Sequence, residues 1–221
     1  MPCPPGRRKR LTVLVYFLDI LLFVYLHSLA RSLFTCEQTD YILTPDLYDG
    51  VSWYYEPHSY QPHRFVLGKP GPRPLVCIGI NPSTAQPGAL DPTLKSVERL
   101  ARFNGFEGWI MFNVYPQRAT NPTDMDKIPD LSLHKENLRW LQAVLRQTEP
   151  TMWAAWGTLI EKRDYLPGLM RDMVALTDQK SIPWVTLGRR SKKGHPHHPL
   201  YLRSDSTPEP FDVKAYLETC F

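Results

Sequence analysis

Two short polar segments of this 221-residue chain carry the side chains best suited to chemistry, and each follows an apolar run. The first segment, residues 79–85, holds the amide of Asn81 and two hydroxyls. The second segment, residues 194–201, holds three imidazoles. An amide can hold a water or the polar edge of a ligand, and an imidazole can transfer a proton or stabilise a developing anion near neutral pH. The two segments therefore predict the two halves of one ligand pocket.

Within these segments Asn81, His195 and His198 are the candidates for catalysis. Turn asparagines more often bond their own backbone, so Asn81 taken alone favours a structural role. The remaining expected ligand contacts of the two segments are Gly79, Pro82, Ser83, Thr84 and Tyr201. The two hydroxyls could donate to an anion or cap the next turn.

A second polar group follows another apolar run, residues 109–112. The amide of Asn113 has one acceptor and two donors, which matches the hydrogen-bonding edge of a nucleobase. Arg118 is suited either to bind phosphate or to tie its loop down through backbone carbonyls. We expect Asn113, Tyr115 and Arg118 to contact the ligand.

The charge pattern restricts the class of partner. The net charge is only +4, so the chain does not coat nucleic acid by charge alone. A local basic run precedes the histidines, with Arg189, Arg190, Lys192 and Lys193. These four residues are candidate phosphate contacts, and the alternative is a solvated loop.

No metal and no cofactor is predicted. Three neighbouring histidines admit a metal site, but no cysteine or carboxylate has a recognised ligand spacing beside them. The four cysteines also lack the spacing of a redox motif. The dipeptide Asp91-Pro92 is typical of a helix start and is interpreted as structural.

The elements that must position these groups alternate along the chain. Apolar runs predict strands at residues 75–80, 109–114, 151–156 and 182–187, and periodicity predicts helices at 93–104, 133–147, 158–164, 166–176 and 212–219. Residues 41–66 are rich in Tyr, Trp and Pro and are expected to form loops and short antiparallel strands, with a strand at 64–67. The pattern predicts a three-layer α/β sandwich with a four-stranded parallel sheet. Because the carboxyl ends of parallel strands share one edge, the polar segments should meet there.

Residues 1–40 form a separate segment, and residues 41–221 are expected to be a single α/β domain. A basic cluster at 7–10 precedes an apolar stretch at 11–30, which is about long enough to span a bilayer, although Asp19 opposes insertion. The segment is either a signal or membrane anchor, or a helix or extension that leaves the protein cytoplasmic. We expect it to be dispensable for folding of the remainder.

Residues 74–203 resemble the domain-of-unknown-function 1643 family. The matching stretches are 81–85, 91–93, Asn113 together with 118–122, 156–157 and 194–201. The resemblance covers about 130 residues with several motifs in order, and it brings no established activity.

A looser resemblance is to uracil-DNA glycosylase-like proteins. Residues 79–82 match their Gly-x-(Asp/Asn)-Pro turn, Asn113 matches their base-reading asparagine, and residues 195–200 match their histidine loop. This resemblance implies that Asn81 positions the attacking water and that a histidine stabilises the departing base. The histidine loop has an extra residue and no serine, so His195 and His198 compete for that role. Ser83 stands where Tyr or Gly is usual, which alters base selection or abolishes activity.

The working hypothesis is a nucleobase- or nucleotide-recognising protein, with hydrolysis of N-glycosidic bonds in DNA or nucleotides as its candidate activity and the question of catalysis left open. Such a reaction needs an unstacked base, a placed water and stabilisation of the departing base. The alternative is a non-catalytic nucleotide or nucleic-acid binding module, tethered to a membrane through residues 11–30 if these span it. An acidic residue at position 81 would favour catalysis, whereas Asn81 leaves both open.

Overall fold

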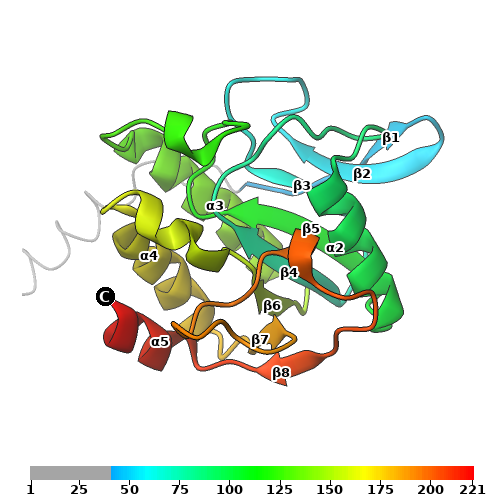
Figure 1. Ribbon diagram of the computed structural model, residues 1–221. Helices are drawn as coiled ribbons and strands as arrows, with labels where there is room; N and C mark the ends of the chain where they lie inside the picture. The colour runs from blue at the N-terminus through cyan, green and yellow to red at the C-terminus, as the bar shows by residue number, and fades with distance from the viewer. Residues whose placement is uncertain (1–40) are drawn as a thin grey trace, which may run out of the picture. The chain divides into compact units, whose positions relative to one another are not determined.

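The structure, a computed structural model, describes residues 41–221, which are built on an eight-stranded mixed sheet (Figure 1). The strands are β1 (Asp46–Tyr48), β2 (Val51–Glu56), β3 (Val66–Lys69), β4 (Pro74–Gly79), β5 (Gly108–Asn113), β6 (Thr151–Ala154), β7 (Trp184–Leu187) and β8 (Pro208–Pro210). Their order across the sheet is β1-β2-β3-β5-β4-β6-β7-β8.

The sheet has more strands than the four parallel strands that the sequence predicted. Neighbouring strands from β5 through β4 and β6 to β7 do pair in parallel. Antiparallel strands extend the sheet at both sides, with β3, β2 and β1 beyond β5 and β8 beyond β7. Strand β8 contains two prolines, so its sequence lacks the apolar alternation that predicts a strand. An edge strand tolerates proline because one of its sides makes no hydrogen bonds to a neighbouring strand.

Helices cover both faces of the sheet, which gives three layers (Figure 1). The helices are α2 (Pro92–Phe103), α3 (Leu131–Gln147), α4 (Leu166–Asp178) and α5 (Val213–Cys220), with short 3₁₀ helices η1 (Pro122–Asp124), η2 (Gly157–Lys162) and η3 (Pro199–Tyr201). Along β4, Val76 and Ile78 pack in one core with α3, α4 and α5. Leu75 and Cys77 alternate to the other face and pack with α2. Burial on both faces explains why the central strands read as continuous apolar runs.

The loops after β4 and β5 stay paired beyond the sheet. Gly79 lies opposite Asn113 in the parallel register. The N–H groups of Val114 and Tyr115 then donate to the carbonyls of Gly79 and Ile80, both at 2.9 Å. These bonds bring the polar segments after the two strands together at one sheet edge.

The membrane prediction falls on residues 11–30, which lie outside the described residues. Across residues 41–221, no helix is long and apolar enough to cross a membrane.

Candidate functional site

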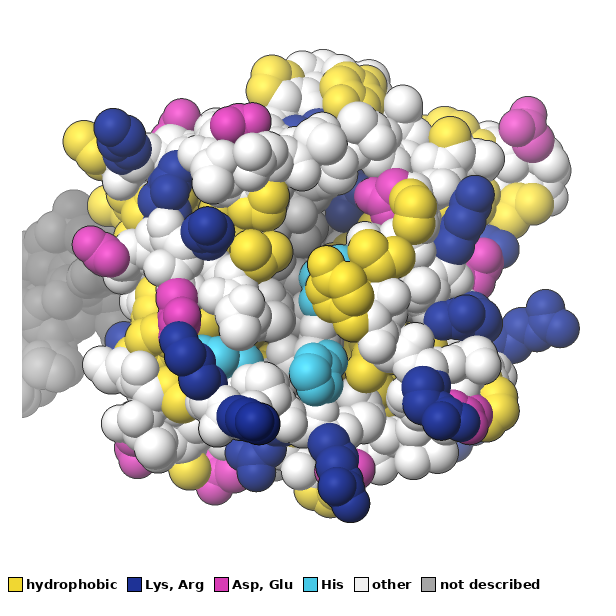
Figure 2. Space-filling view, in the orientation of Figure 1, with side chains coloured by type: hydrophobic (Ala, Val, Ile, Leu, Met, Phe, Trp, Pro, Cys, Tyr) yellow, Lys and Arg dark blue, Asp and Glu magenta, His cyan; other side chains and the backbone are white. Residues whose placement is uncertain are grey.

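A pocket of about 410 Å³ lies at the carboxyl ends of β4 and β5. Its walls come from the loops after both strands, the start of α2 and the segment 194–201, called the histidine loop below. They include Asn81, Ser83, Asn113 and His198. Figure 2 shows a hollow on this face with histidine side chains beside it. The structure thus brings together the two asparagines and one of the two competing histidines.

Asn81 holds the two loops together. Its Nδ2 donates to the carbonyl oxygens of Pro82 at 3.1 Å and of Ala119 at 2.7 Å. Both amide hydrogens are therefore committed to the backbone, and only Oδ1 remains to accept a hydrogen bond from a ligand or a water.

Asn113 is fully buried, and neither its Nδ2 nor its Oδ1 has a hydrogen-bond partner among the described residues. Its backbone carbonyl accepts from Asn137 Nδ2 at 2.9 Å, which anchors the strand end. Across the register, a Cβ at Gly79 would lie 2.5 Å from Met111 Cε and 3.0 Å from Asn113 Oδ1. Glycine at position 79 is thus what makes room for the amide at the base of the pocket.

His198 is the histidine that lines this pocket. Its Nδ1 accepts from the N–H of Leu200 at 3.4 Å at the start of η3. The neutral ring then carries its proton on Nε2, the nitrogen that this contact leaves unused. Burial lowers the pKa of His198 below its ordinary value, and the charge of Asp91 opposes the shift. The neutral ring is therefore the form favoured at neutral pH.

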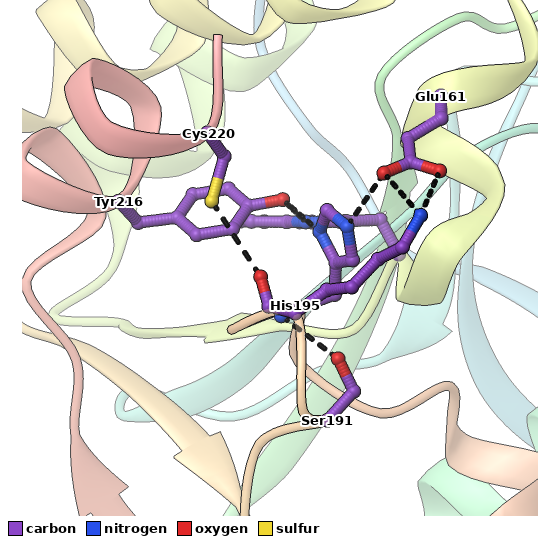
Figure 3. Close-up of polar contacts among 7 residues, drawn as sticks. Glu161, Ser191, His195, Tyr216 and Cys220 are labelled. Atoms are coloured by element: carbon purple, nitrogen blue, oxygen red, sulfur yellow. Dashed lines mark hydrogen bonds and ion pairs between the residues drawn. The ribbon is translucent and has the colours of Figure 1, made fainter.

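His195 lies outside this pocket, buried in a network of its own (Figure 3). Trp156 Nε1 donates to the Tyr216 hydroxyl at 3.0 Å, and that hydroxyl lies 2.8 Å from His195 Nδ1. His195 Nε2 lies 3.0 Å from Glu161 Oε1, and a carboxylate can only accept, so Nε2 carries a proton and donates it to Glu161. In the neutral ring, Nδ1 then accepts from the Tyr216 hydroxyl. The hydrogen bond from His195 and the ion pair with Lys193 lower the pKa of Glu161.

The two histidines share the wall of a smaller cavity of about 290 Å³. His195, His197, His198 and the exposed Tyr201 all line it, and His198 also lines the larger pocket. Both ring nitrogens of His195 are already bonded, so this histidine holds its loop rather than facing the base of the larger pocket.

Three other predicted contacts do not line the pocket. Tyr115 is fully buried in the core, where its hydroxyl accepts from the N–H of Asp130 at 2.8 Å. Arg118 donates to the carbonyls of Ser83 and Ala85, so it ties down its loop. Thr84 is exposed and is not part of the pocket wall.

The basic run precedes the histidine loop and remains a predicted phosphate surface. Lys193 pairs with Glu161 at 3.3 Å, and the guanidinium of Arg190 lies 5.7 Å from the centre of the Phe211 ring. Arg189 and Lys192 are exposed.

Arg64 is a pocket residue that the sequence patterns missed. It is 1% exposed and lines the pocket from the segment before β3. Arg64 directly precedes an apolar run in the sequence, but this is a weak indication of a pocket residue because strand ends often carry a charged residue.

Residues 41–221 contain no group of three or more His, Cys, Asp or Glu side chains that could hold a metal ion.

A family model described as "Protein of unknown function (DUF1643)" matches residues 64–200. The chain belongs to this family. No curated protein and no solved structure matched the chain. The match to the DUF1643 model begins at Arg64 and ends at Leu200, so it contains the whole wall of the pocket. Tyr216, whose hydroxyl contacts His195 Nδ1, lies beyond it.

Proposed function

We propose that this DUF1643 protein recognises a nucleobase or nucleotide in the pocket at the ends of β4 and β5. The observation that carries the proposal is the Asn113 amide, which is buried at the pocket base with an unpaired donor and an unpaired acceptor. A base edge that presents an acceptor beside a donor satisfies both atoms at once. A buried amide without partners costs about 1–3 kcal/mol, which a matching ligand recovers.

The size and chemistry of the pocket support this class of ligand. Its volume of about 410 Å³ falls in the usual range for small-molecule sites. Apolar groups of Met111, Leu94 and Leu159 share the wall with the polar atoms, as a flat heteroaromatic ring requires.

Access to Asn113 needs one side chain to move, because the amide is fully buried. Met111 is the side chain best placed to do so, since it lines the pocket and its Cε lies against Gly79 beside the amide. Methionine has three rotatable bonds and changes rotamer at little cost. We infer that Met111 swings away when the base enters.

The test is a binding screen of the full-length chain against nucleobases, nucleosides and their 5′-monophosphates by isothermal titration calorimetry. Asn113→Leu should abolish binding, while Asn104→Ala should not. Asn104 is the matched control because it lies at the far end of α2, where its side chain donates to the Leu100 and Ser206 carbonyls. Binding that survives Asn113→Leu would contradict the proposal.

Hydrolysis of the N-glycosidic bond is a second candidate, favoured by the tautomer of His198. A neutral ring with Nε2–H can donate to the base as the bond between base and sugar breaks. The water oxygen then bonds to the sugar carbon while its proton passes to solvent, and the departing base anion takes up a proton. Asn81 can orient that water through Oδ1 but cannot accept its proton, so turnover should be slow.

Release of free base from nucleosides and oligonucleotides, followed by chromatography, tests this second candidate. His198→Ala should lower turnover by roughly a hundredfold, as removal of one such donor does in other enzymes. Asn113-dependent binding without any base release would leave the protein a binding module.

A further inference from the structure

Arg64 is the pocket residue with the least satisfied charge. The side chain is 1% exposed, and its Nε has no partner among the described residues. Within residues 41–221, the one hydrogen bond of its guanidinium, from Nη1 to the carbonyl of Ala85, is long at 3.4 Å. In the described part of the chain no carboxylate lies within ion-pair distance of it. A buried cation without a paired counter-ion is strongly unfavourable, and an anionic ligand would compensate its charge.

The surroundings of Arg64 are electropositive. Burial, followed by the charge of Arg118, lowers the pKa of Arg64 to about 9, while Asp91 opposes the shift. Arg64 is therefore still charged at neutral pH. The guanidinium of Arg118 is held nearby through Ser83 and Ala85, so it cannot move away to relieve the repulsion.

The start of α2 adds a second source of positive potential to the same pocket. Pro92, Thr93 and Leu94 form the first turn of this 12-residue helix, and all three line the pocket. First-turn N–H groups have no partner within a helix, and the helix dipole favours anions there. Asp91 Oδ1 satisfies the N–H of Leu94 at 2.9 Å, and Pro92 has no N–H. The N–H of Thr93 is left without an intrahelical partner.

We propose that Arg64 and the first turn of α2 bind a phosphate group of the ligand, so that the pocket takes a nucleotide rather than a free base. A guanidinium presents paired N–H donors that match phosphate oxygens, and helix N-termini are established phosphate sites. The Asp91 carboxylate lines the same wall and weakens the positive potential, but its cap to Leu94 holds one oxygen away. The inference rests on the proposed function for the base half of the ligand, whereas the phosphate half has its own test.

The experiment compares nucleosides, their 5′-monophosphates, dinucleoside monophosphates and inorganic phosphate on the full-length chain by calorimetry and thermal denaturation. The variants are Arg64→Met, Arg64→Lys and the control Arg99→Met. Arg99 is exposed on α2 and is not part of the pocket wall. We expect the wild-type chain to bind a monophosphate at least roughly tenfold more tightly than its nucleoside, the usual effect of one charge-assisted contact.

Arg64→Met should lose that preference and keep the nucleoside affinity, and Arg99→Met should keep both. Without ligand, Arg64→Met should melt at the wild-type temperature or above, because it removes an uncompensated charge. Arg64→Lys keeps the positive charge but lacks the planar paired donors of a guanidinium, so it should retain part of the preference for the monophosphate. Tighter binding of dinucleoside monophosphates than of monophosphates would identify a nucleic-acid strand as the source of the phosphate.

Two results separate this inference from the proposed function. Nucleosides that bind through Asn113 with the same affinity as their monophosphates would overturn the phosphate site and leave base recognition intact. If no nucleoside binds but inorganic phosphate raises the melting temperature of the wild type and not of Arg64→Met, the phosphate site stands and base recognition fails.

Discussion

Asn113 and Arg64 are buried polar side chains that the fold leaves short of partners. Native structures satisfy nearly all such groups, so two around one pocket are more informative than any sequence motif in this chain. Each also makes a measurable prediction about stability, because a residue kept for a ligand is expected to weaken the empty protein.

Asn113→Leu should stabilise the ligand-free protein by about 1–3 kcal/mol, because leucine has a similar volume and no polar atoms to leave unpaired. Urea denaturation of the two proteins at pH 7 measures the difference. Asn104→Ala should instead destabilise the protein, since it removes two hydrogen bonds. A loss of stability in Asn113→Leu would show that the amide is paired in solution.

Glu56 makes a pH-dependent prediction. Burial raises its pKa to about 7, and the nearby His58, at 3.2 Å, opposes the shift. A raised carboxyl pKa means that the protonated form stabilises the fold. That stabilisation is complete below the ordinary pKa of 4.5 and is lost as the pH rises through about 7.

Glu56→Gln should therefore gain stability relative to the wild type between pH 5 and 8, as denaturation midpoints at several pH values would show. Glu149→Gln, a change at an exposed carboxyl, should follow the wild type across this range. Parallel curves for wild type and Glu56→Gln would contradict the raised pKa.

At the scale of elements, the histidine loop is positioned by α5 and η2 rather than by its own sequence. Tyr216 of α5 and Glu161 of η2 bond the two ring nitrogens of His195. The loop closes on itself as well, with Ser191 N–H donating to the carbonyl of His195 at 2.9 Å. This support leaves His198, three residues further on, at the wall of the larger pocket.

Tyr216→Phe should cost about 1–3 kcal/mol of stability, because Trp156 Nε1 and His195 Nδ1 both lose a buried partner. Amide hydrogen exchange in residues 191–198 should also accelerate, since the loop loses an anchor. Tyr201→Phe is the control, because that hydroxyl belongs to a side chain that is 78% exposed. Unchanged exchange in the loop would mean that other contacts hold it.

At the scale of the whole molecule, residues 41–221 contain two apolar cores and an eight-stranded sheet. A fragment of this length buries enough surface to fold by itself. We expect the 41–221 fragment to be soluble in detergent-free buffer and to unfold in one cooperative thermal transition. Aggregation, or melting without a transition, would show that residues 1–40 contribute to the core.

The sequence by itself determined the central parallel strands, the helices that cover them and the family. Strong apolar runs and 3.6-residue periodicity are local signals, so β4, β5, β6 and β7 could be found without the fold. The same signals located Asn81, Asn113 and the histidine segment at the ends of strands, where parallel sheets form pockets.

Only the tertiary structure decided which of these side chains face the pocket. His195 and His198 are three residues apart, and packing against Tyr216 and Glu161 directs one away from the pocket wall that the other lines. The sequence did not reveal the burial of Arg64 either, since a charged residue before an apolar strand can be solvated or buried. Partners and burial depend on residues far apart in the chain, and no local pattern encodes them.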